Sequence, residues 1–88
     1  MPSPIRLSDL PDGACATVEC LVAGVGAAAI DAAALHRLGE LGFLPGEPVQ
    51  LLRRGPGGRE PLAVLVGETT MFALRLLEAQ CIEVRSAA

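Results

Sequence analysis

Two side chains near the middle of the sequence, His36 and Glu40, have the types and the spacing to bind a metal ion. A separation of four residues places both on one face of a helix, about one turn apart. An imidazole nitrogen and a carboxylate oxygen so placed can hold a divalent transition ion such as zinc or iron. The alternative is a solvated helix face on which the pair forms only a local hydrogen bond.

The number of available ligands restricts the form of such a metal site. The sequence has one histidine, so a tetrahedral ion on His36 and Glu40 would need two more ligands from water, anions or another chain. A two-fold pair of chains is the commonest way to supply one. If the site forms, we expect the ion to lie between molecules, in a metal-bridged homodimer.

The three cysteines, Cys15, Cys20 and Cys81, are the other potential metal or redox groups. They contain no Cys-x-x-Cys pair, so a closed structural zinc site cannot be built locally. We expect Cys20 to lie in the core, because free cysteine packs as a small hydrophobic residue. Cys15 and Cys81 are predicted to face outward from the first and last strands, where ordinary packing is favoured over a redox pair.

The sequence gives no case for an enzyme. Its three serines, Ser3, Ser8 and Ser86, all lie near the termini. A nucleophile needs a base within hydrogen-bonding distance and a third group to orient that base, and no such set converges here. We therefore expect a non-enzymatic protein with no required cofactor.

Composition argues against nucleic-acid and membrane binding. The net charge is −3, the seven basic residues are scattered arginines, and tryptophan and tyrosine are absent. A nucleic-acid surface needs clustered positive charge and aromatic side chains for stacking. No apolar run approaches the roughly 20 residues of a membrane span, and the start lacks a signal-peptide hydrophobic segment. Together with an odd number of cysteines, this predicts a cytoplasmic protein.

A helix must position the His36–Glu40 pair. Asp31 is a suitable N-cap, because its carboxylate can accept a hydrogen bond from a free backbone N–H of the first turn. Gly42 fits the position just after the helix, where a left-handed backbone favours glycine. The buried stripe of this helix is predicted from three leucines at helical spacing: Leu35, Leu38 and Leu41.

Short strands are predicted before and after this helix. The first covers residues 14–22, and alternation places Ala16, Val18 and Cys20 on its core face. Three more are predicted at residues 48–54, 62–66 and 69–73, separated by turn signals at Gly55-Pro-Gly-Gly58 and Gly67-Glu68.

The end of the chain is predicted to form a short helical turn within residues 74–79 and a last strand at 81–85. Ile82 and Val84 should point inward and Cys81 outward. Five short strands with one inserted helix predict a mainly β fold, a small five-stranded SH3-like barrel in which residues 1–88 form a single domain. Closure would remove most exposed strand edges.

Three arginines, Arg53, Arg54 and Arg59, bracket the glycine-rich hairpin and make its tip positive. We favour solvated hairpin charge, and the alternative is a docking patch for an acidic partner surface. The hairpin is not a phosphate loop, because it lacks the lysine and the following helix.

Four segments, in order, resemble the FeoA family of small bacterial proteins. The most specific is Leu38-Gly-Glu-Leu-Gly-Phe-Leu-Pro-Gly46, which is similar to the family's Leu-x-x-Leu-Gly-hydrophobic-x-Pro-Gly element. The others are Ile5-Arg-Leu-Ser-Asp-Leu-Pro-Asp-Gly13, Glu60-Pro-Leu-Ala-Val-Leu-Val66 and Phe72-Ala-Leu-Arg-Leu-Leu-Glu-Ala-Gln-Cys-Ile-Glu-Val84. One departure is Arg59-Glu60, where the family usually has Gly-Asp.

The resemblance implies an accessory protein of ferrous iron uptake. In that family the small protein is thought to act on FeoB, a membrane iron permease with a cytosolic GTP-binding domain, as a docking module that modulates the permease. The alternative is a metal-responsive regulatory domain, like the SH3-like C-terminal domains of iron-dependent repressors. The sequence favours the first, because the predicted barrel leaves no room for a helix-turn-helix segment.

Overall fold

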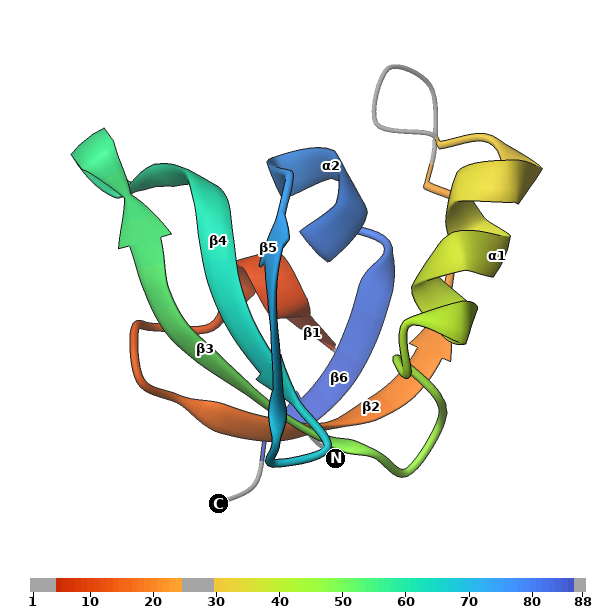
Figure 1. The fold of residues 1–88 in the computed structure, drawn as a ribbon, viewed down its shortest axis with the longest axis horizontal. Coiled ribbons are helices and arrows are strands. Elements are labelled where there is room, and N and C mark those ends of the chain that lie inside the picture. The colour runs from red at the N-terminus through yellow and green to blue at the C-terminus, as the bar shows by residue number, and fades with distance from the viewer. Residues whose placement is uncertain (1–4, 25–29, 87–88) are drawn as a thin grey trace.

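A computed structural model describes residues 5–24 and 30–86, and places nearly half of them in one antiparallel sheet (Figure 1). The strands lie in the order β1-β6-β2-β3-β4-β5. Figure 1 shows the sheet strongly curved, with α2 at one open end and α1 beside β6 and β2. The elements are β1 (Ile5–Arg6), η1 (Leu7–Asp9), β2 (Cys15–Leu21), α1 (Ala32–Glu40), β3 (Pro48–Gly55), η3 (Pro56–Gly58), β4 (Arg59–Val66), β5 (Thr70–Leu74), α2 (Leu76–Ala79) and β6 (Ile82–Ser86).

The core is mainly aliphatic and lies inside the curve of the sheet. Each long strand contributes alternate side chains to it, as a sheet with one buried face requires. Phe43 is its largest fully buried side chain, and its ring centroid lies 6.1 Å from that of the half-buried Phe72. The other large, fully buried side chains are Leu7, Leu38, Leu51, Leu62, Ile82, Val18, Val64 and Val84.

The predicted helix is confirmed at both of its ends. The Asp31 carboxylate accepts a hydrogen bond of 2.7 Å from the Ala34 N–H and so caps the first turn. Gly42 has φ +113°, the left-handed backbone expected after the last turn. The predicted apolar stripe faces the core, with Leu38 buried and its two companions partly buried.

The prediction of five strands is wrong by one strand. The structure has a sixth, β1, in which Ile5 pairs with Val84 and Arg6 with Glu83. Two residues are too few to show the alternation by which strands are recognised in a sequence. They form a strand because β6, far away in the chain, pairs with them.

The predicted positions of two cysteines, Cys20 in the core and Cys81 facing outward, are wrong. Val18 pairs with Val84 but Cys20 pairs with Glu83, so Glu19 is an extra residue in a β-bulge that reverses the alternation. Cys20 is therefore half-buried beside a carboxylate rather than in the core. Cys81 was predicted to face outward but is fully buried. It precedes β6 in the turn that ends α2, where strand alternation does not apply.

Removing one buried leucine should destabilise this small core. Leu38 is 1% exposed, whereas Leu44, six residues later, is 50% exposed. We expect Leu38→Ala to lower the free energy of unfolding by about 2–5 kcal/mol. Leu44→Ala should change it by about 0.5 kcal/mol or less. Urea unfolding of both variants measures the difference, and equal losses would contradict the assignment of Leu38 to the core.

Candidate functional site

Helix α1 presents the predicted metal-binding pair to solvent. The His36 and Glu40 side chains are 77% and 66% exposed, and His36 Nε2 lies 3.7 Å from Glu40 Oε2. Both lie on the face of α1 away from Leu38, which anchors the helix to the core. The structure thus brings the two residues together, at the separation that the helical spacing predicts.

The geometry of the pair suits one metal ion with two protein ligands. Ligand atoms about 2.1 Å from a tetrahedral ion lie roughly 3.4 Å apart, so a small rotation of either side chain would allow both atoms to coordinate. Within residues 5–24 and 30–86, no group of three or more histidine, cysteine, aspartate or glutamate side chains is placed to hold an ion. Further ligands would have to come from outside these residues.

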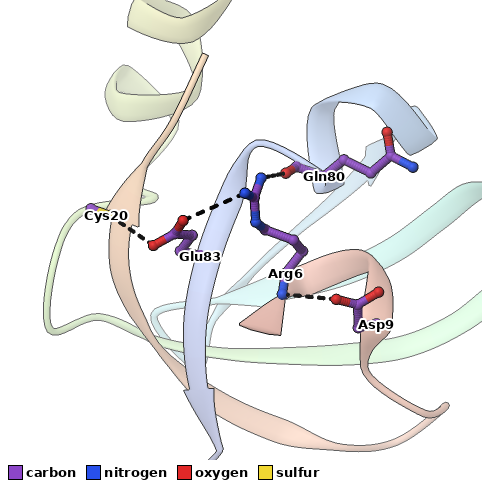
Figure 2. Close-up of polar contacts among 5 residues, drawn as sticks. All are labelled: Arg6, Asp9, Cys20, Gln80 and Glu83. Carbon is purple, nitrogen blue, oxygen red and sulfur yellow. Dashed lines mark hydrogen bonds and ion pairs between the residues drawn. The ribbon is translucent and has the colours of Figure 1, made fainter. Parts of the chain in front are cut away.

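A second polar cluster joins β1, β2 and β6 near the bulge (Figure 2). The Cys20 thiol donates a hydrogen bond of 3.4 Å to Glu83 Oε1, and Arg6 Nη2 lies 3.6 Å from Glu83 Oε2. Arg6 Nη1 also donates to the Gln80 carbonyl oxygen at 2.6 Å. Figure 2 shows the guanidinium between the carboxylate and this carbonyl. The cluster ties the first strand to the last.

Two of the thiols are held in their protonated form. Burial, followed by the hydrogen bond and negative charge of Glu83, raises the pKa of the Cys20 thiol. Burial also raises the pKa of the Cys81 thiol. Because the thiolate is the nucleophile and the metal ligand, neither residue is set up for that chemistry. Cys15 is exposed and lies at the opposite end of the β2–β6 pair from Cys81, so these two do not meet.

The three hairpin arginines have different environments. Arg54 donates hydrogen bonds to the carbonyl oxygens of Ser8 and Leu10 at 2.6 and 2.8 Å, and its Nε lies 3.6 Å from Asp12 Oδ1. It therefore fastens the segment after β1 to β3. Arg53 and Arg59 are exposed, so they alone give the hairpin its outward positive charge.

A groove that the sequence did not predict lies between α1 and the β5–α2 segment. It has a volume of about 480 Å³. Ile30, Ala34 and Arg37 line it on the side of α1, and Ala73, Arg75 and Leu77 line it opposite. No sequence pattern predicts this groove, because its two walls are more than thirty residues apart in the chain and come together only in the folded protein. None of the helices in the described residues is long and apolar enough to cross a membrane.

Comparison with known proteins gives one family. The FeoA domain model matches residues 5–86, nearly the whole chain. A comparison with curated proteins found no match.

Several solved structures are similar to this one. FeoA of Stenotrophomonas maltophilia, solved in complex with zinc, is 44% identical, with a TM-score of 0.76 over 91% of this chain and 88% of that one. It is described as a prokaryotic SH3 domain protein with a suggested role as a ferrous iron transport activating factor. FeoA of Chlorobium tepidum is 28% identical, with a TM-score of 0.78 over 96% of this chain and 71% of that one. The prediction of a mainly β, SH3-like fold is confirmed.

Metal-dependent repressors also share the fold. A manganese-dependent transcriptional repressor in complex with manganese has a TM-score of 0.77 at 21% identity. The match covers 98% of this chain but 38% of the repressor. This similarity is one of fold alone.

The environments of the thiols predict an order of reactivity. With a disulfide reagent at mildly alkaline pH, we expect the exposed Cys15 to react first and Cys20 more slowly, because its raised pKa leaves less thiolate. Cys81 should react only on unfolding. Mass spectrometry of the modified peptides gives the order, with Cys15→Ser as the control that should abolish the fast phase. Fast labelling of Cys81 in the folded protein would contradict its burial.

Proposed function

The chain belongs to the FeoA family, and we propose that it serves ferrous iron uptake as a non-enzymatic accessory protein that docks on a FeoB-type membrane permease. Proteins of this family are accessory proteins of iron transport. The observation that carries the proposal is the match over residues 5–86, together with 44% identity to a FeoA of nearly the same extent. Docking on the permease is the more specific part of the proposal. It rests on the association of the FeoA family with ferrous iron transport.

The use of the acidic side chains supports a binding role over a catalytic one. Asp31 caps α1, Glu78 accepts the Arg75 N–H at the start of α2, and Asp9 accepts the Arg6 N–H before η1. A carboxylate engaged in capping stabilises a helix end and is poorly placed to exchange protons with a substrate. A docking function requires only a shaped and charged surface.

A metal-responsive regulatory domain is the alternative. The repressor neighbours favour it by fold, but the chain covers only 38% of the repressor that it matches. The S. maltophilia FeoA, by contrast, is matched over 88% of its own length. A permease gene beside the gene for this chain would favour docking over regulation.

Docking predicts direct binding to the permease. We expect calorimetry with a detergent-solubilised FeoB-type permease to give a dissociation constant in the micromolar range or tighter, because a single small domain offers an interface of limited area. The isolated GTP-binding domain, with and without GTP, shows whether that part suffices. Deletion of the gene should lower ferrous iron uptake. Absence of binding together with unchanged uptake would contradict the proposal.

We also propose that His36 and Glu40 bind a divalent transition ion such as zinc between two copies of the chain. The 3.7 Å separation of their ligand atoms and the zinc complex of the S. maltophilia FeoA support this. Two protein ligands leave an ion open to further ligands, which a second copy could supply. Binding should weaken in acid, because a protonated imidazole has no free electron pair to coordinate.

Sedimentation velocity with and without zinc tests this bridge. The wild type should shift toward a dimer when zinc is added, and His36→Ala should not. Glu40→Gln should shift less than the wild type, whereas Glu68→Gln, which removes a carboxylate elsewhere on the surface, should behave as wild type. If the distributions of wild type and His36→Ala are the same with zinc, the pair is a solvated helix face.

A further inference from the structure

We propose that the protein partner docks by adding an extended acidic segment to the free edge of β5, in the groove between that edge and α1. This inference rests on the docking function proposed above and assigns it a surface and a binding mode. The expected occupant is a β-strand-like stretch of the partner that carries carboxylate side chains.

The first observation is that β5 ends the sheet. Among the strands of the described residues it has β4 as its only neighbour, with all five residues from Thr70 to Leu74 in register with β4. In an antiparallel pair only every second residue directs its N–H and C=O to the neighbouring strand. The alternate residues of β5 therefore direct theirs away from β4. In Figure 1, β4 lies on one side of β5, and α2, β6 and beyond them α1 lie on the other.

The second observation is that this edge is less protected than the opposite one. The other edge strand, β1, has only two residues, and its Arg6 is tied to Glu83 and Gln80. Natural proteins usually shorten, charge or cover their edge strands to prevent pairing. Strand β5 instead carries Met71, whose side chain is 64% exposed. Such an edge is a template for an added strand.

The third observation is the groove at the C-terminal end of this edge, where Ala73 of β5 is part of the lining. Its lining is mixed: Ile30 and Ala34 on one side and Ala73 and Leu77 on the other are apolar or small, and the remaining lining residues are charged. At about 3.4 Å per residue, the five residues of β5 would pair with a segment of similar length. Alternate side chains of that segment would face the lining, and main-chain hydrogen bonds to β5 would hold its backbone.

The fourth observation concerns charge and selects an acidic occupant. Arg37 of α1 and Arg75 after β5 lie on opposite walls of the groove. Both are exposed, and within the part of the chain that the structure describes neither guanidinium has an ion pair or hydrogen bond. Glu78 also lines the groove, but its carboxylate already accepts the Arg75 N–H. Two arginines and one glutamate leave the lining with a formal charge of +1 in a chain of net charge −3, and this local positive charge complements carboxylates of a partner.

Charge reversal of the two arginines tests the surface. The probe is the detergent-solubilised FeoB-type permease, and binding is measured by calorimetry with the full chain. We expect Arg37→Glu/Arg75→Glu to weaken binding by about tenfold or more. The matched control is Arg53→Glu/Arg59→Glu, which gives the same net charge but reverses two exposed arginines of the hairpin. Circular dichroism and urea unfolding of both double variants confirm that they remain folded.

Hydrogen exchange tests the binding mode. If a strand is added, alternate backbone amides within residues 70–74 should exchange at least about tenfold more slowly in the complex, because each gains a hydrogen-bonded partner. Docking through side chains alone would leave these amides unchanged, and that result would overturn strand addition even if the arginine variants bind weakly.

The outcomes separate this inference from the docking function. If the wild type does not bind the permease, both fail. If the wild type binds and the groove variant binds as well as it does, the groove is overturned while docking stands. If the hairpin control loses as much affinity as the groove variant, the hairpin tip is the contact and the groove is again overturned. Selective loss in the groove variant, with protection of β5, supports the inference.

Discussion

The packing of the Phe43 ring into the core, directly after Gly42, is the interaction on which the arrangement of the surface depends. Gly42 takes a left-handed backbone conformation, and the Phe43 N–H then donates to the Leu38 carbonyl oxygen at 3.2 Å. The ring enters the core with no exposed surface and lies 6.1 Å from Phe72 of β5. One side chain therefore connects the end of α1 to β5. The two walls of the groove, and the outward face that carries His36 and Glu40, are positioned by that connection.

Charge is used unevenly in this protein. Three arginines, Arg6, Arg54 and Arg85, form ion pairs, and the first two also bind main-chain carbonyl oxygens. These fasten the N-terminal segment and the last strand to the sheet, where hydrogen bonds to a charged donor contribute more than neutral ones. The other arginines are exposed at the hairpin and along the groove. Within the described residues, the arginines without an ion pair thus lie at two places, and the proposed experiments distinguish between them.

The bulge at Glu19 shows how one residue changes the chemistry of a strand. Without it, Cys20 would follow Ala16 and Val18 into the core. With it, the thiol faces Glu83, and burial and the nearby carboxylate raise its pKa. Glu19 itself pairs with Arg85 on the neighbouring strand. The result is a polar cluster that stabilises the junction of three strands and lowers the reactivity of the thiol.

The sequence by itself determined the features that depend on neighbouring residues. The Asp31 cap, the leucine stripe of α1, the left-handed Gly42 and the inward-facing Ile82 and Val84 follow from periods and turns of a few residues, and the SH3-like class follows from their order. Tertiary structure alone decided the sixth strand, the bulge, the burial of Cys81 and the groove between α1 and β5. Each of these requires a partner far away in the chain. Pairing register and the approach of distant walls are set by the packing of the whole core, which no local pattern encodes.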